Sequence, residues 1–323
     1  MSKSPPISFI VIAYNEESNI ESTLDAITSL HGLCDYEVIV VNDGSVDATA
    51  SIVKGSAARD PHIRLIDLVT NTGRGHARSV GVKAAQGELI ATVDADILLP
   101  RDWLIRTTAA LTQCDAVAGI PVPDGDVAYI HRRFQLTPRV VLATATVTGS
   151  NGLYRRRVFD LVQYDSSLRE GEDSALNHDM RRCGFSLATL PDLLVVHQEK
   201  KSFITSLKWL FAVGRGATRQ LFEYHQIRQP DVFTGTVLAG LIVGVFIAIE
   251  VSWLGILLPL ALVWAAAIQH VTSRFYTSMQ QPVRVALAVT ADGAMLMAYF
   301  CGRLAGIVLA IQRRKSARAI GGA

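Results

Sequence analysis

Short apolar runs rich in β-branched residues alternate with amphipathic stretches from Ser8 to about His197, and this alternation constrains the fold more than any other feature. Near-continuous apolar runs are typical of parallel strands buried on both faces, and the intervening stretches predict βαβ units with right-handed crossovers. The sequence therefore predicts an α/β domain with a mainly parallel sheet over residues 1–200. In its first part we expect strands at residues 8–14, 36–41, 63–68 and 89–93, and helices at 17–30 and 46–58.

After Asp231 the composition changes to almost wholly apolar, in agreement with a mean hydropathy of +0.29 for the whole chain. Residues 232–268 are too many for one membrane crossing, which needs about 20 residues, so we predict a helical hairpin that turns near Glu250. A third apolar stretch covers residues 283–311 and is followed by basic residues. Residues 232–323 are thus predicted to form a transmembrane region with two to three spans.

Two ionisable residues, Asp292 and Arg303, lie inside the third apolar stretch. They are about three helical turns apart and share a helix face, so we expect a tether to another helix or to lipid headgroups rather than catalysis. Three spans would place the basic C-terminal residues opposite a cytoplasmic catalytic domain, against the positive-inside tendency. One candidate span is therefore expected to be re-entrant or interfacial.

Residues 201–231 form an amphipathic, basic linker, for which an interfacial membrane helix and an ordinary surface helix are equally favoured. A net charge of +2 argues against nucleic acid as a partner. No basic segment followed by an apolar core precedes the first strand, so no signal peptide is predicted. The cysteines have neither metal-ligand spacing nor the pattern of a disulfide framework, which favours a reducing compartment; they are Cys34, Cys114, Cys183 and Cys301.

Polar clusters follow the first two predicted strands. The first is Ala13-Tyr14-Asn15-Glu16, and the second is Asn42-Asp43-Gly44-Ser45 with Asp47 close behind. A short acid at a strand end can accept a base N–H or a ribose hydroxyl, which makes Asp43 a candidate nucleotide contact. The alternative is that these residues cap the following helix, and both interpretations can hold together.

Asp94-Ala95-Asp96 directly follows the apolar run at residues 89–93. Oxygen ligands suit Mg²⁺ or Mn²⁺, which proteins commonly bind through one or two carboxylates plus substrate phosphates. Ligands of open α/β sheets lie beyond the carboxyl ends of the strands, so the pair predicts a metal–diphosphate site. The alternative is a polar strand end without a ligand. His197, which ends another apolar run, is either structural or a further metal ligand.

Three more polar segments complete the pattern. Gly73 to Arg78 combines glycines with arginines before a helix, which favours phosphate. Gly149 to Asn151 forms a second small polar segment. Gly171-Glu172-Asp173 stands where a helix should begin, and helix capping is the plain alternative for its carboxylates.

Taken together in this order and spacing, the six motifs resemble those of the inverting family 2 glycosyltransferases of the GT-A fold, over residues 7–200. The segment from His197 to Gly216 and the membrane tail are similar to bacterial exopolysaccharide glycosyltransferases of the succinoglycan type. The resemblance implies a GT-A nucleotide-binding, Rossmann-like sheet, a nucleotide-diphosphate sugar donor and Mn²⁺ or Mg²⁺.

The resemblance also implies roles for single residues. Asp173 would be the catalytic base and Glu172 would support it near the acceptor, while Asp96 and His197 would hold the metal. The residues implied in donor binding, which include the base contact Asp43 and the diphosphate contact Arg78, are Ala13, Tyr14, Glu16, Asp43, Arg78, Asp94 and Ala95. Asn42 stands where many relatives carry Asp, and we expect little cost. The Gln-x-x-Arg-Trp motif of processive synthases is absent, which favours the addition of one sugar per encounter.

These implications predict an inverting transferase that moves a sugar to a hydroxyl of a lipid-linked saccharide at the inner membrane, with the catalytic domain cytoplasmic. UDP-sugars are the commonest donors of the family, and GDP- and dTDP-sugars stay open. One alternative is a polyprenyl-phosphate sugar synthase, whose acceptor is already ionised and needs no base. Another is a non-catalytic membrane partner subunit, which the intact set of Asp94, Asp96 and Asp173 disfavours.

Overall fold

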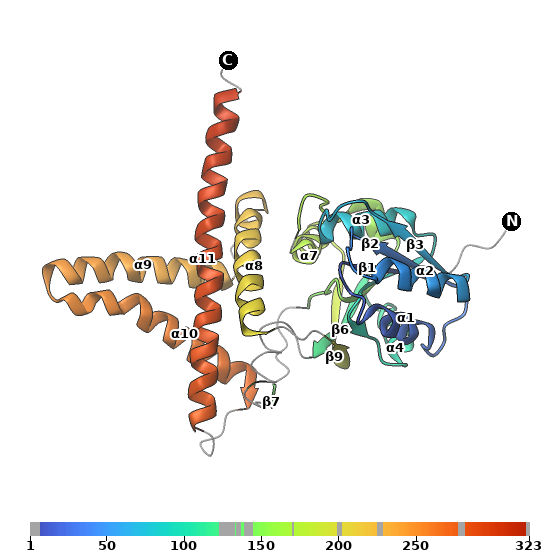
Figure 1. Ribbon diagram of the computed structural model, residues 1–323, viewed down its shortest axis with the longest axis horizontal. Helices are drawn as coiled ribbons and strands as arrows, with labels where there is room; N and C mark the ends of the chain where they lie inside the picture. The colour runs from blue at the N-terminus through green and yellow to red at the C-terminus, as the bar shows by residue number, and fades with distance from the viewer. Residues whose placement is uncertain are drawn as a thin grey trace. The chain divides into compact units, whose positions relative to one another are not determined.

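The computed structural model describes residues 7–122, 133, 137–138, 145–169, 171–198, 202–224, 229–276 and 282–320 (Figure 1). The chain divides into two compact units, with a boundary near residue 200 and residues 125–141 assigned to the second unit. Residues 1–6, on which the signal-peptide prediction rests, lie outside the described residues. Each unit is described by itself below.

Four parallel strands form the first half of the main sheet, in the order β3-β2-β1-β4. Every residue of β1 is buried, which is the burial expected for a central strand covered on both faces. The alternation along β1 divides the core, because Phe9 and Val11 face one cluster and Ile10 and Ile12 face the other. The strands are β1 (Ile7–Ala13), β2 (Tyr36–Asn42), β3 (Ile63–Asp67) and β4 (Leu89–Asp94).

The second half of the sheet is mixed and continues in the order β8-β6-β9-β5. β8 runs antiparallel to both β4 and β6, whereas β9 runs parallel to β6 and antiparallel to β5. The α/β sheet is as predicted, but the later strands make it mixed instead of mainly parallel. These strands are β5 (Ile97–Leu98), β6 (Ala116–Val122), β8 (Asn151–Arg155) and β9 (Leu187–His197).

Helices cover both faces of this sheet. One core cluster includes side chains of α1, α2 and α4, and the other includes side chains of α3, α6 and α7. The helices begin where the polar motifs end, so the motifs lie in the loops at the carboxyl edge of the strands. The helices are α1 (Ile20–Thr28), α2 (Thr49–Arg59), α3 (Arg74–Ala84), α4 (Trp103–Ala110), α6 (Arg157–Leu161) and α7 (Glu172–Arg182).

The second unit is mainly helical. The predicted hairpin is present as α9 and α10, joined by a short 3-10 helix, and α11 contains the third apolar stretch. Among the residues that the structure describes, three helical segments are long and apolar enough to cross a membrane: Val232–Glu250, Trp253–Ser273 and Pro282–Gln312. The elements are β7 (Thr137–Pro138), α8 (Phe203–Tyr224), α9 (Gln229–Glu250), η1 (Trp253–Leu257), α10 (Leu258–Arg274), β10 (Phe275–Tyr276) and α11 (Pro282–Ile320).

The ionisable residues of the third apolar stretch are buried in this unit. Asp292 is 0% exposed and both of its oxygens lie within hydrogen-bond distance of Nδ1 of His270, at 2.8 and 2.9 Å. This contact between α10 and α11 is the helix tether expected for Asp292. The side chains of Arg313, Arg314 and Lys315 lie outside the described part of the chain.

Candidate active site

The loops that follow β1 and β2 are joined by hydrogen bonds. The side-chain oxygen of Asn15 accepts the backbone N–H of Val46, and the N–H of Glu17 donates to Asp47. Burial acts to raise the pKa of Asp47, but hydrogen bonds from Thr49 and from the N–H of Glu17 outweigh it and hold the pKa below its usual range. Asp47 thus binds the N–H of Thr49, the first residue of α2, although the N-cap position itself is Ala48, and the hydrogen bonds between the two loops make them one floor.

Asp43 lies between this floor and the loop that leads to α3. Its carboxylate is 4% exposed and accepts hydrogen bonds from the N–H and hydroxyl of Thr72 and the N–H of Gly73, at 2.7–2.8 Å. A carboxylate has about four acceptor positions, so one is left for another donor. The nucleobase contact of Asp43 stays a prediction, and its visible role is to fix the loop at residues 71–73.

The other predicted nucleotide contacts of this edge differ in exposure. The Tyr14 side chain is exposed, Ala13 is buried and Glu16 is half-buried. The carboxylate of Glu16 accepts a hydrogen bond from Asn19, and the carbonyl of Ala13 accepts one from the N–H of Asp43. Tyr14 therefore has a ring face available to a ligand, whereas Ala13 acts through its backbone.

Asn42 is buried, and its amide donates a hydrogen bond of 2.7 Å to Asp67 at the end of β3. Its carbonyl oxygen accepts the N–H of Ser45 at 3.3 Å. An amide can make both contacts because it carries a donor and an acceptor, whereas a carboxylate has acceptors only. Asn42 therefore suits a chain that places an acid at position 67.

Replacing Asn42 with aspartate is expected to destabilise the protein by about 1–3 kcal/mol, because two carboxylates would then face each other without the donor. The double variant Asn42→Asp, Asp67→Asn exchanges donor and acceptor and should recover at least half of the loss. Thermal unfolding of the full-length protein in detergent measures both. An Asn42→Asp variant as stable as the parent would contradict this account of the pair.

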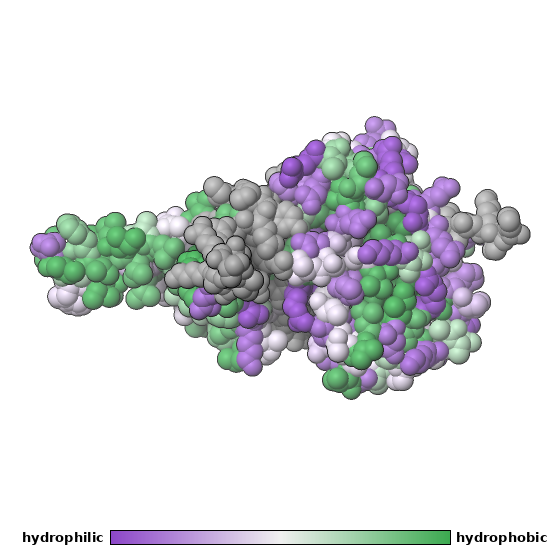
Figure 2. Space-filling view, turned by 90° about the horizontal axis from the view of Figure 1, so that it is seen from above, coloured by the Kyte–Doolittle hydropathy of each residue, from purple (hydrophilic) through white to green (hydrophobic). Residues whose placement is uncertain are grey.

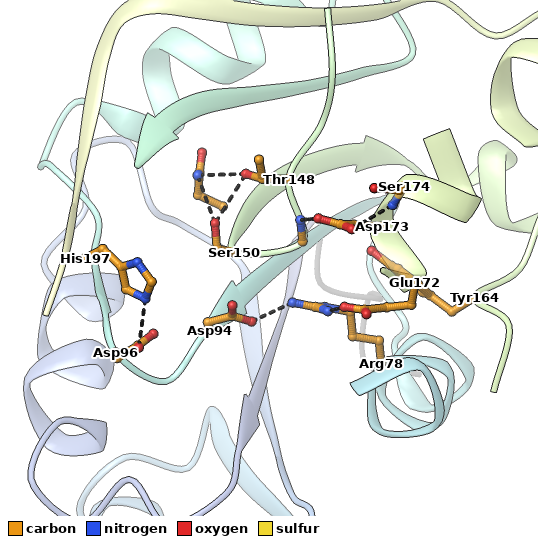
Figure 3. Close-up of polar contacts among 12 residues, drawn as sticks. Arg78, Asp94, Asp96, Thr148, Ser150, Tyr164, Glu172, Asp173, Ser174 and His197 are labelled. Atoms are coloured by element: carbon orange, nitrogen blue, oxygen red, sulfur yellow. Dashed lines mark hydrogen bonds and ion pairs between the residues drawn. The ribbon is translucent and has the colours of Figure 1, made fainter. Parts of the chain in front are cut away.

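Asp96 and His197 meet where the short β5 pairs with the end of β9. Nε2 of His197 lies 2.8 Å from Oδ2 of Asp96, and the backbone N–H of Gln198 donates to the carbonyl of Asp96 (Figure 3). Ile97 and His197 are register partners, so the two side chains come together although 101 residues separate them. Ala95 between the acids is buried, and its carbonyl accepts the hydroxyl of Thr23.

This pair fits a divalent cation. The 2.8 Å between the two atoms is a hydrogen-bond distance, and the fit rests on their chemistry, because a carboxylate oxygen and an imidazole nitrogen are both ligands of divalent ions. Within the described residues no group of three or more His, Cys, Asp and Glu side chains converges on one point. Two protein ligands plus substrate phosphates is the arrangement that Mg²⁺ commonly takes, and the imidazole also suits Mn²⁺.

Arg78 joins the two acidic segments of the site. Its guanidinium is 2% exposed and contacts Asp94 at 2.5 Å and the carboxylate of Glu172 on its other side (Figure 3). Gly149 makes room for it, since a Cβ there would lie 2.5 Å from the central guanidinium carbon. The predicted contact of Arg78 with the diphosphate stays a prediction, and in the structure its charge is matched by the two acids.

Asp173 stands in the first turn of α7, next to Glu172 but with a different environment. Glu172 is 3% exposed and paired with Arg78, whereas Asp173 is half-buried and accepts the N–H of Ser174 at 2.6 Å and that of Gly149 at 3.5 Å. Asn177 fixes the helix by donating to the carbonyls of Val147 and Asp173. Asp173 is thus the more accessible acid of the pair, as a proton acceptor must be.

Two tyrosines complete the site, and the sequence pattern gave no signal for them. The guanidinium of Arg78 lies over the ring of Tyr164, with 5.9 Å between its carbon and the ring centroid, and the Tyr164 hydroxyl donates to that of Tyr154 at 3.4 Å. Burial raises the pKa of Tyr154 and of Tyr164, so both stay neutral at pH 7. Their neutral rings support the cation without adding charge.

The chain was compared with known proteins. Residues 8–162 match the model of the glycosyl transferase family 2. The chain is 31% identical over 226 residues to the succinoglycan biosynthesis protein ExoO of Rhizobium meliloti, and the aligned region covers 63% of this chain and 63% of that protein. It is 30% identical over 239 residues to the uncharacterized glycosyltransferase EpsJ of Bacillus subtilis, with 67% of each chain covered.

A solved structure shares the fold. The mannosyltransferase PcManGT from Pyrobaculum calidifontis, in complex with GDP-Man and Mn²⁺, matches with a TM-score of 0.61 and 22% identity, over 94% of this chain and 88% of that one. The match covers the sheet and the helical region, so the architecture is that of a GT-A glycosyltransferase. With the family match and the ordered motifs on one sheet edge, we conclude that the chain belongs to glycosyltransferase family 2.

Proposed function

We propose that this protein is an inverting glycosyltransferase that moves a sugar from a nucleotide-diphosphate sugar, with UDP-sugars favoured, to a hydroxyl of a lipid-linked saccharide. The observation that carries the proposal is the chain of ion pairs Asp94–Arg78–Glu172, in which Arg78 and Glu172 are buried and Asp94 is partly buried. It links the segment Asp94-Ala95-Asp96, whose Asp96 would hold the metal, to the first turn of α7, where Asp173 stands. Donor and acceptor ends of one site are thereby held in a fixed relation.

The chain's own residues would divide the work. Asp173 accepts the proton of the attacking hydroxyl while the nucleoside diphosphate leaves from the opposite face of the anomeric carbon, which inverts its configuration. Arg78 keeps Asp94 and Glu172 in place, and the floor formed by the β1 and β2 loops receives the nucleoside. Asp96 and His197 would hold Mn²⁺ or Mg²⁺, which supplies charge neutralisation at the leaving diphosphate when bound.

The apolar helices of the second unit support a membrane location. We place the protein in the cell inner membrane as a multi-pass protein with a cytoplasmic catalytic unit, where nucleotide sugars and lipid-linked saccharides can meet. The basic residues after the last apolar stretch favour the cytoplasmic side. Its partners would be the donor, the lipid-linked acceptor and membrane lipids.

A donor and acceptor screen tests this function. Full-length protein in detergent is given UDP-, GDP- and dTDP-sugars with Mn²⁺, with Mg²⁺ or with chelator, in the presence of a lipid extract. We expect release of one nucleoside diphosphate that depends on the metal and on the lipid, and a lipid product whose anomeric proton shows inversion. Donor turnover with retained configuration, or no binding of any donor, would contradict the proposal; the latter favours a non-catalytic partner subunit.

A further inference from the structure

The hairpin of α9 and α10 carries apolar side chains on all sides. Leu241, Ile242 and Val243 are consecutive, point in three directions about 100° apart, and are all exposed. The surface of this arm is predominantly hydrophobic in Figure 2. Further exposed apolar side chains near its tip are Val245, Phe246, Ile249, Val251, Trp253, Leu254, Ile256 and Leu257. A helix that is apolar all round belongs in a protein core or in lipid.

The hairpin has the length of a bilayer and is tightly closed. Val232–Glu250 has 19 residues, about 28 Å of helix, against a hydrocarbon thickness of about 30 Å. Its two arms touch at Gly244 and Gly255, where a Cβ on either glycine would lie 2.4 Å from the carbonyl oxygen of the other. Glu250 and Ser252 are at the turn, where a polar group can reach the far surface.

α11 takes a different direction. Figure 1 shows the hairpin projecting away from α11, so that α9 runs across α11 instead of alongside it. The helix that lies alongside α11 is α8. Their backbones are in close contact, because a Cβ on Gly302 would lie 2.0 Å from the carbonyl oxygen of Phe211, and a Cβ on Gly306 would lie 2.8 Å from that of Arg215.

Charged side chains on the exposed face of α8 limit where α11 can lie relative to a membrane. Lys208 and Arg215 are exposed on α8, together with Ile204 and Phe211. The contact of Arg215 with Gly306 lies nine residues, about 13 Å, from the middle of the apolar stretch Pro282–Gln312. Phe211 contacts Gly302, which is only about 8 Å from that middle, so a crossing centred on the stretch would carry the nearby Lys208 into hydrocarbon and leave Arg215 near its edge. Burying Lys208 in this way is unfavourable.

The charged residues of α11 agree with this argument. Asp292 and Arg303 are 0% and 1% exposed, and the hydroxyl of Thr218 on α8 donates to the carbonyl of Arg303 at 3.1 Å. Asp292 is thus buried against α10, where it contacts His270, and Arg303 is buried against α8. Part of the apolar surface in the middle of α11 packs against α8 and α10, and further apolar side chains towards its two ends, such as Leu287 and Val308, are exposed. The exposed apolar side chains of α11 therefore suit contact with acyl chains at the bilayer surface, and the charges of α8 argue against a crossing.

We propose that the α9–α10 hairpin is the membrane-crossing element of this unit, and that α8 and α11 lie along the surface of a phospholipid bilayer on the side of the catalytic unit. Ile204 and Phe211 would contact acyl chains and Lys208 and Arg215 anionic headgroups. Two crossings bring the basic C-terminal residues back to the catalytic side, which resolves the conflict with the positive-inside tendency. The proposal rests on the membrane location proposed above.

Cysteine labelling tests the sidedness. In full-length protein the four native cysteines are replaced by serine, and single cysteines are placed by Val251→Cys at the hairpin turn and Ser316→Cys near the C-terminus. A third variant retains Cys34, exposed in the catalytic unit, as the reference. Spheroplasts of a bacterial host are treated with a membrane-impermeant maleimide before and after permeabilisation. Gel filtration in detergent confirms that each variant is folded.

We expect Val251→Cys to be labelled in intact spheroplasts, and Cys34 and Ser316→Cys only after permeabilisation, at least tenfold more than before. Labelling of Ser316→Cys together with Val251→Cys in intact cells would mean three crossings and would overturn the proposal. Protection of Val251→Cys in intact cells would overturn it too, because the hairpin would not cross. Labelling does not depend on donor turnover, so this experiment tests the membrane topology independently of the proposed transferase activity.

Discussion

Asp173→Asn is expected to lower kcat for sugar transfer by about 10²- to 10⁴-fold, with little change in donor affinity. The reason is geometric as well as chemical. Asparagine keeps the size of the side chain and can still accept the N–H of Ser174, but it cannot take the proton of an acceptor hydroxyl. Glu172 cannot replace it, because that carboxylate is buried and paired with Arg78.

Steady-state nucleotide release measures this effect, with Asp179→Asn as the matched control. Asp179 is on the same helix, is also half-buried and lies outside the site, so its replacement should leave kcat within about twofold. If Asp173→Asn retained full activity, no base would be needed. The acceptor would then be a phosphate, as in a polyprenyl-phosphate sugar synthase, instead of a hydroxyl.

Arg78→Met should destabilise the protein by about 3–5 kcal/mol, the largest stability effect that we expect from a single substitution in the site. Methionine fills much of the same volume, but it leaves Glu172 buried without its cation and Asp94 without its partner. For a catalytic unit of this size such a loss lowers Tm by roughly 6–20 °C. The variant should also lose activity, because both acids can then move.

Thermal unfolding of the full-length protein in detergent tests this, with Arg59→Met as the control. Arg59 pairs with Glu21 at the surface, where both side chains are more than half exposed, so its loss should cost less than about 1 kcal/mol. Adding Glu172→Gln to Arg78→Met should restore part of the stability, because an amide is less costly to bury than a charge. Equal Tm values for Arg78→Met and Arg59→Met would refute the stabilising role of the buried Arg78–Glu172 pair.

The first half of the sheet could be predicted because the signal for each strand lies within a short segment of sequence. Each is a short, nearly continuous apolar run, so burial alone indicates it, and the observed bounds of β1 to β4 differ from the expected ones by one residue or less. The later strands depend on long-range pairing. The antiparallel direction of β8 between β4 and β6 is set by contacts that no local pattern contains.

The candidate site shows the same division. That Asp96 and His197 meet was inferred through family resemblance, since 101 residues separate them. The burial of Arg78 between two acids could not be foreseen, because an arginine in a glycine-containing segment before a helix also fits a phosphate contact. The same holds for Gly75, whose place before a helix also predicts a phosphate contact. A Cβ there would lie 2.2 Å from the carbonyl oxygen of Asp165, so this glycine is needed for packing within the chain.

The helices of the second unit could be predicted from the sequence, but their arrangement could not. The length of the apolar region and the polar residues near Glu250 predicted the hairpin, because a single helix of that length exceeds a bilayer. Composition gives α11 the same signature as a span. The close contact of α11 with α8 is a tertiary feature that the sequence pattern does not predict. Because of this contact, a crossing by α11 would move the charged side chains of α8, Lys208 and Arg215, towards the hydrocarbon.

The metal site proposed at Asp96 and His197 would bind the donor's diphosphate. Its most direct test is calorimetry of nucleoside diphosphate binding with Mn²⁺ and with chelator, for the parent protein and for Asp96→Ala. Removing a ligand should cost at least as much as removing a ligand's supporting partner, about 10- to 100-fold in metal affinity. We predict that Mn²⁺ tightens binding to the parent and has no effect on folded Asp96→Ala; an equal Mn²⁺ effect on both would contradict the account.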